Sequence, residues 1–180
     1  MLGAEKDATL ARKMMAELPE KLSQSAAVQF LLGVDAEHRQ LPQVAGEHFA
    51  KARASNDPLA PAVVADVAGA LIGRKYLGLP PAAGGQLVET GLRIWPNHPD
   101  LLLIRGQTSF QAHRYAEAIS DLNKAVVAKK NDATLTIRLA DDVRLHQTLG
   151  SAYAKLGQRA NAEAHLSLAR AAAARKEQLQ

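Results

Sequence analysis

The sequence predicts an all-α protein, and three features of its composition carry this prediction. The chain has 180 residues, of which 47% are hydrophobic but only 4% aromatic, so small side chains must let its elements approach closely around a sizeable core. Alanine-rich segments such as AEAHLSLARAAAARKEQ, residues 162–178, have high helix propensity. Alternating runs of Val, Ile and Thr, which mark strands, are scarce. Helices packed on helices satisfy all three observations.

A spacing of small and bulky residues recurs along the chain and predicts paired helices. Glycine on the inner face lets two antiparallel helices approach closely, and a bulky residue opposite fills the space beside them. Each pair leaves an apolar face that only a neighbouring pair can cover, so the pairs are expected to stack as a solenoid. The three clear copies are Gly150, Tyr153, Gly157, Ala162, Leu166 and Ala169; Gly106, Ser109, His113, Ala118, Leu122 and Ala125; and Gly33, Ala36, Gln40, Ala45, Phe49 and Ala52.

A fainter copy lies between the first and second clear ones. It places Tyr76 near the end of a first helix and LGLPP in the turn, with Gly84, Val88 and Gly91 along a second helix. The equivalent reference points of the four copies are separated by 39, 34 and 44 residues, so the unit is about 34 residues long with insertions between some copies. These reference points are Gly33, Ile72, Gly106 and Gly150.

The pattern resembles the tetratricopeptide repeat (TPR) family of the bacterial type. The residues that carry the resemblance are Leu149, Gly150, Tyr153, Gly157, Ala162, Leu166 and Ala169 in the last copy, and Leu32, Gly33, Ala45, Phe49, Ala52 and Pro58 in the first. The resemblance covers nearly the whole chain. It implies a right-handed solenoid of antiparallel helix pairs, with about four repeats plus an N-terminal helix, and a single domain over residues 1–180.

Three segments depart from the pattern. Arg105 and Ser109 stand where Leu and Tyr are expected, which predicts either a loosely packed third repeat or a register that is off by one. The helical spacing of apolar residues after 132 predicts one long helix from about Ala133 to Leu156. The segment DATLARKMMAELPE resembles the second helix of a repeat, which leaves two alternatives: a solitary capping helix, or a chain excised from a longer array.

Charge and composition argue against several classes of partner. The net charge of +4 is spread along the chain, and its densest run, Lys124 to Lys130, is diluted by AVVA, so no nucleic-acid partner is predicted. No segment has the apolar length of a signal peptide or a membrane span. The chain has no cysteine, which excludes disulfides and Cys-ligated zinc. The compartment stays open between the cytoplasm and, if a leader or parent chain is missing, the periplasm.

No catalytic or metal site is predicted, and no cofactor is implied. None of the six histidines belongs to an HExxH motif or has another histidine four residues away, so each is expected on the surface or in a groove. The glycines of LPPAAGGQ lack the Lys-Ser/Thr of a phosphate loop. Asp141 and Asp142 are adjacent and therefore point to different faces of a helix. The chain is predicted not to be an enzyme.

The resemblance implies that the first helix of each repeat lines a concave face, where aromatic and amide side chains form a groove for a protein or peptide. The alternative for Phe30, Leu103 and Phe110 is burial in the core. The chaperone-type carboxylate clamp of Lys and Asn is absent from the corresponding positions. The predicted partner-binding residues are Phe30, Val34, Glu37, His38, Tyr76, Gln107, Phe110, Gln111, Gln147, Ser151 and Lys155.

Three functions are compatible with these residues. The first is a non-catalytic protein-interaction scaffold that binds a peptide or partner subunit on its concave face. The second is an accessory domain of a larger bacterial periplasmic metalloprotease or envelope-assembly or secretion protein, because AYAKLGQRANAEAHLSLARA is similar to the C-terminal repeats of some such proteins. The third is a self-assembling module, a homo-oligomer, motivated by the apolar residues Leu10, Met14 and Met15.

Overall fold

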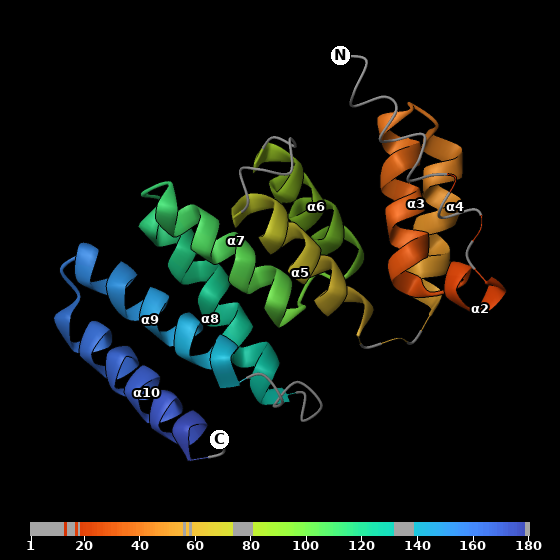
Figure 1. Cartoon of the computed structure of the whole chain (residues 1–180). Coiled ribbons are helices and arrows are strands. Elements are labelled where there is room, and N and C mark those ends of the chain that lie inside the picture. The colour runs from red at the N-terminus through yellow and green to blue at the C-terminus, as the bar shows by residue number, and fades with distance from the viewer. Residues whose placement is uncertain are drawn as a thin grey trace. The chain divides into compact units, whose positions relative to one another are not determined.

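The structure, a computed structural model, describes residues 13, 17, 19–55, 57, 59–73, 81–131 and 139–178, and the regular elements within these ranges are all α-helices. The prediction of an all-α chain is therefore confirmed. The chain forms two compact units, Met1–Val63 and Val64–Gln180. The helices are α2 (Glu20–Ser23), α3 (Ala26–His38), α4 (Pro42–Ala54), α5 (Ala60–Gly73), α6 (Pro81–Ile94), α7 (Pro99–Gln111), α8 (Tyr115–Asn131), α9 (Leu139–Lys155) and α10 (Arg159–Glu177) (Figure 1).

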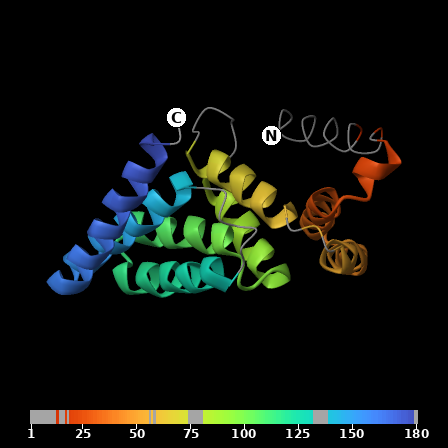
Figure 2. The same cartoon turned by 90° about the horizontal axis from the view of Figure 1, so that it is seen from below.

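Three pairs of consecutive helices pack against each other over much of their length: α3 on α4, α7 on α8, and α9 on α10. Within the second unit α9 also packs on α7 and α8, and both views show α9 and α10 next to α7 and α8 (Figures 1 and 2). The helix starts follow ordinary rules, because Pro42 and Pro99 occupy first-turn positions where a missing N–H costs nothing. The architecture is therefore helical and repeat-like.

The turns that join the three pairs are built alike. Each consists of three residues, 39–41, 112–114 or 156–158, and its middle residue has a positive φ: 59° at Gln40, 60° at His113 and 75° at Gly157. After this residue the backbone N–H bonds back to a carbonyl five residues earlier, a common way to end a helix. These bonds are Leu41 N to Ala36 O (3.0 Å), Arg114 N to Ser109 O (2.8 Å) and Gln158 N to Tyr153 O (2.9 Å).

The glycine of each clear copy lies against the bulky residue of its partner helix. A Cβ built on Gly33 would be 2.5 Å from Cε1 of Phe49, and one on Gly106 would be 2.6 Å from Cγ of Leu122. Gly150 has the same relation to Leu166, at 2.7 Å. No side chain larger than hydrogen fits at these positions while the helices keep this separation.

The faint copy uses the same contact with the sizes exchanged. Here the reference residue is Ile72 on α5, and the small residue is Gly84 on α6. A Cβ on Gly84 would be 2.7 Å from both the Ile72 side chain and the carbonyl oxygen of Ala68. In this copy the bulky residue lies on the first helix and the glycine on the second, the reverse of the other copies. This exchange explains why the copy is difficult to find by sequence.

The third repeat is neither loose nor out of register, so both expectations drawn from Arg105 and Ser109 are wrong. Gly106 contacts Leu122 at the same offset as in the other copies, and Leu122 is fully buried. Ser109 is also buried. Arg105 does not need to be Leu, because an acidic partner on α8 neutralises it, as described below.

The last copy is less enclosed than the others. Phe49 and Leu122 are buried, whereas the equivalent Leu166 is 38% exposed. Leu122 belongs to α8, which packs on both α7 and α9, whereas α10 packs chiefly on α9. The predicted helix 133–156 corresponds to α9, and its expected first turns lie outside the described residues. Most of the N-terminal helical segment also lies outside them.

Candidate functional site

The first helices of three consecutive repeats surround a hollow in the second unit. Its volume is about 280 Å³, and among the residues that the structure describes its walls come from α5, α7 and α9. The family resemblance implied that these three helices, together with α3, line one face. The lining residues are Ala65, Asp66, Gly69, Ala70 and Ile72 of α5, Ile104, Gln107, Thr108 and Gln111 of α7, and Arg144 of α9.

The hollow combines apolar walls with amide and charged groups. Ile72 and Ile104 supply branched apolar side chains, and a Cβ on Gly69 would lie 3.2 Å from Cδ1 of Ile104. Gln107 and Gln111 follow each other one turn apart on α7. Each glutamine carries both hydrogen-bond donors and acceptors, the same complement as a peptide bond. The site therefore has the chemistry to hold a short stretch of polypeptide.

Opposite charges contribute to this hollow from its two outer helices. Asp66 belongs to α5 and Arg144 to α9, and both side chains are exposed. Neither residue is among the predicted partner-binding residues. They share one offset, six residues before the reference points Ile72 and Gly150, so the repeat register contained the signal that would have found them.

The predicted partner-binding residues divide into several groups. Gln107 and Gln111 line the hollow. Gln147, Ser151 and Lys155 lie further along α9, with Gln147 and Lys155 exposed and Ser151 half-buried. Tyr76 lies outside the described residues. In the first unit Val34 is half-buried, and Glu37 and His38 are exposed on the last turns of α3.

The aromatic residues behave differently from the amides. Phe30 is fully buried, with its ring centroid 5.9 Å from that of Phe49, and Leu103 is also buried. Both are core residues, so the alternative of burial holds for them and we exclude Phe30 from the contact surface. Phe110 is half-buried and packs on Tyr115 at 5.5 Å. Because their spacing repeats every helical turn, such residues look the same in sequence whether they line a groove or a core.

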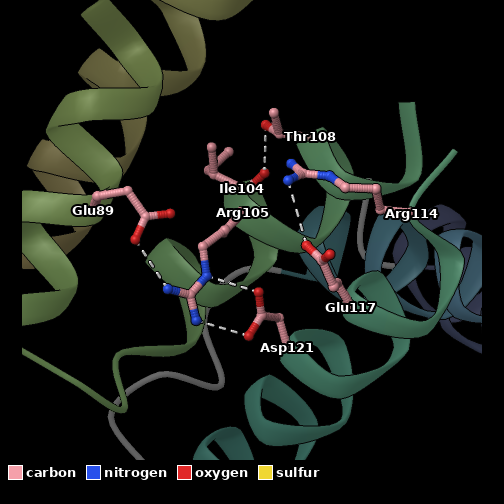
Figure 3. A network of polar contacts seen from close by, with 7 residues as sticks. All are labelled: Glu89, Ile104, Arg105, Thr108, Arg114, Glu117 and Asp121. Carbon is pink, nitrogen blue, oxygen red and sulfur yellow. Dashed lines mark hydrogen bonds and ion pairs between the residues drawn. The ribbon is translucent and has the colours of Figure 1, made fainter. Parts of the chain in front are cut away.

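A second hollow, also about 280 Å³, lies where α6, α7 and α8 meet, and Figure 3 shows the polar contacts among residues of these helices. At its centre the Arg105 guanidinium donates to both carboxylate oxygens of Asp121, from Nε at 2.7 Å and from Nη2 at 2.8 Å, and to Glu89 Oε2 from Nη1 at 3.2 Å. The bonds to Asp121 raise the pKa of Arg105 further, so it is permanently charged. One arginine thereby connects three helices from two repeats.

Two histidines that the sequence treated separately form a pair. His146 of α9 and His165 of α10 are both half-buried, with their Nδ1 atoms 3.1 Å apart. They are therefore not isolated surface or groove residues. Spacing within a single helix does not reveal this contact, because the two histidines belong to different helices. Among the described residues no group of three or more His, Cys, Asp or Glu side chains is placed to hold a metal ion.

Comparison with known proteins does not assign a function to this site. No protein-family model matches the chain, and neither the curated proteins nor the solved structures contain a match. Of the helices described, none combines the length and the apolar character needed to cross a membrane. The candidate site therefore depends on its own geometry: an amide-lined, partly apolar hollow formed by the first helices of three consecutive repeats.

Proposed function

We propose that the chain is a non-catalytic protein-interaction scaffold of the TPR type. Its helix pairs stack as a right-handed antiparallel solenoid, and a peptide or partner subunit binds along the face formed by α5, α7 and α9. The observation that carries the proposal is the composition of the hollow, whose described lining residues all belong to these first helices and include the predicted residues Gln107 and Gln111.

Recurrent local geometry supports the assignment to the TPR type. The three left-handed turn residues and the three glycine contacts occur at fixed offsets from one another. A shared offset in both the turn and the interhelical contact is expected of repeats that share one supersecondary unit. An accessory role within a larger envelope protein is compatible with the same surface. The self-assembly alternative depends on Leu10, Met14 and Met15, which lie outside the described residues.

The chemistry of the hollow favours an extended peptide. A polypeptide in extended form exposes its backbone N–H and C=O groups, and two glutamines one turn apart match these groups. A small apolar side chain of the peptide fits beside Ile72 and Ile104.

The test is a selection of peptides from a random displayed library on the whole chain, followed by titration of the selected peptides. Gln107→Ala combined with Gln111→Ala should weaken binding at least about tenfold, equivalent to roughly 1.4 kcal/mol. Gln86→Ala is the matched control, because Gln86 is exposed on α6 and does not line the hollow. Equal binding by the double variant and the wild type would place the contact elsewhere and refute the proposal.

A further inference from the structure

The contact between His146 and His165 has the geometry of a hydrogen bond between two rings. The Nδ1 atoms are 3.1 Å apart and the ring centroids 5.3 Å, with 24° between the ring planes. The distance between the two centroids exceeds the distance between the two Nδ1 atoms by about the sum of the two ring radii. Both Nδ1 atoms therefore lie between the centroids, and the rings meet edge to edge with these nitrogens facing each other. Such a contact requires a proton on one Nδ1 and a lone pair on the other.

The pair belongs to a small polar cluster that ties three helices together. The Tyr153 ring lies parallel to His165, with centroids 5.5 Å apart and 7° between the planes. The Tyr153 hydroxyl accepts a hydrogen bond of 2.9 Å from the Asn123 side chain on α8. A change at the histidine pair therefore affects the packing of α10 on α9 and the neighbouring contact with α8.

We infer that His146 and His165 form a proton-sensitive joint, by which we mean a hydrogen-bonded contact between α9 and α10 that depends on pH. The contact is kept while at least one ring is uncharged, and it breaks when both rings are protonated. The first proton binds Nε2 of the ring that donates, and the N–H to N bond remains. A second proton must bind the Nδ1 that accepts, which brings two N–H groups and two positive charges face to face. The two protonation steps are therefore coupled.

The charged groups around the pair add to this effect. Burial lowers the pKa of His146, and the neighbouring His165 lowers it further; Lys129 and Lys130 of α8 act in the same direction, while Asp142 raises it. Lys129 donates to Asp142 at 2.9 Å, which offsets part of that carboxylate's charge. Of the charged residues on α7, Asp100 is buried and Arg105 is bound by Asp121 and Glu89.

On α10 the residues one turn from His165 are uncharged: Asn161, Ala162, Leu168 and Ala169. Burial lowers the pKa of His165. Both histidines thus bind protons less readily in the folded chain than in the unfolded one. When the pH falls below the ordinary histidine pKa of about 6.5, the unfolded state takes up more protons, so acid destabilises the fold through this pair.

The first test follows the two imidazoles of the full chain by NMR across a pH titration, in EDTA. We expect both pKa values below the ordinary histidine value and two distinct steps. His165→Gln should raise the pKa of His146, because it removes a neighbouring positive charge. Two independent transitions at about 6.5 in the wild type would overturn the inference, and this wild-type titration does not depend on the folding of any variant.

The second test compares melting temperatures at about pH 7.5 and pH 5.0. Between these pH values the melting temperature of the wild type should fall by at least about 2 °C more than that of His146→Gln combined with His165→Gln. The double variant has no titrating group at the joint. His113→Asn is the control, because His113 is an exposed histidine of the same unit and Asn tolerates its φ of 60°; it should lose as much as the wild type. An equal fall in melting temperature in the wild type, the double variant and the control would refute the inference. A wild-type melting temperature that EDTA lowers would show a metal-held pair instead, and would also overturn the inference.

Discussion

Arg105 and Asp121 form a two-point ion pair between α7 and α8, with nitrogen to oxygen distances of 2.7 and 2.8 Å. The Asp121 side chain is 9% exposed and that of Arg105 is 30% exposed. A planar guanidinium matches a carboxylate in this bidentate way, which a lysine does not. Arg105 occupies a position where the repeat pattern expects Leu, so the pair replaces an apolar contact with a directed polar one.

Arg105→Leu should therefore destabilise the fold although it restores the typical residue. The substitution leaves the Asp121 carboxylate nearly buried without its cation, which costs about 2–4 kcal/mol of unfolding free energy. Arg105→Leu combined with Asp121→Leu should cost less than the sum of the two single changes, because no unpaired charge remains. Urea denaturation followed by circular dichroism measures all three variants.

Arg114→Leu is the matched control in the same hollow. Arg114 pairs with Glu117 at 3.5 Å, but both side chains are more than half exposed, so the loss should stay within about 0.5 kcal/mol. Equal losses for Arg105→Leu and Arg114→Leu would mean that the Arg105 pair contributes no more than a surface ion pair.

Alanine substitutions of three glycines should separate close packing from helix propensity. Gly106→Ala places a Cβ 2.6 Å from the buried Leu122 and should destabilise the chain by about 1–3 kcal/mol. Gly150→Ala should cost less, because Leu166 is 38% exposed and can move outward. Gly85→Ala meets no atom within 4 Å in α6 and should stabilise by about 0.5–1 kcal/mol. A stabilising Gly106→Ala would show that α7 and α8 are farther apart than described.

Substitutions at Gly157 and Gln40, which occupy equivalent positions in the turns between paired helices, should change the stability in opposite directions. Gly157 has a φ of 75°, so Gly157→Ala should destabilise by about 1 kcal/mol, although nothing lies within 4 Å of its Cβ position. Gln40 holds φ at 59° with a side chain, so Gln40→Gly relieves strain and should stabilise by up to about 1 kcal/mol. Thermal unfolding of both variants checks the signs, and a stabilising Gly157→Ala would contradict a left-handed turn there.

Local spacing was sufficient to predict much of this protein. The all-α class, the three clear helix pairs and the contact of Gly33, Gly106 and Gly150 with a bulky residue all follow from residues that lie within one repeat. Even the seventh position after each reference glycine, occupied by Gln40, His113 and Gly157, has one backbone conformation in the structure. These features depend on helical periodicity and turn chemistry, which short stretches of sequence encode.

The polar contacts between helices, which lie outside the repeated spacing of small and bulky residues, were decided by the tertiary structure. The pairing of His146 with His165, the partner of Arg105, and the contributions of Asp66 and Arg144 to the hollow all depend on which side chains two packed helices bring together. The burial of Phe30 was open for the same reason. A single sequence specifies the face of a helix on which a residue lies, but the neighbour that covers that face is known only once the helices have packed.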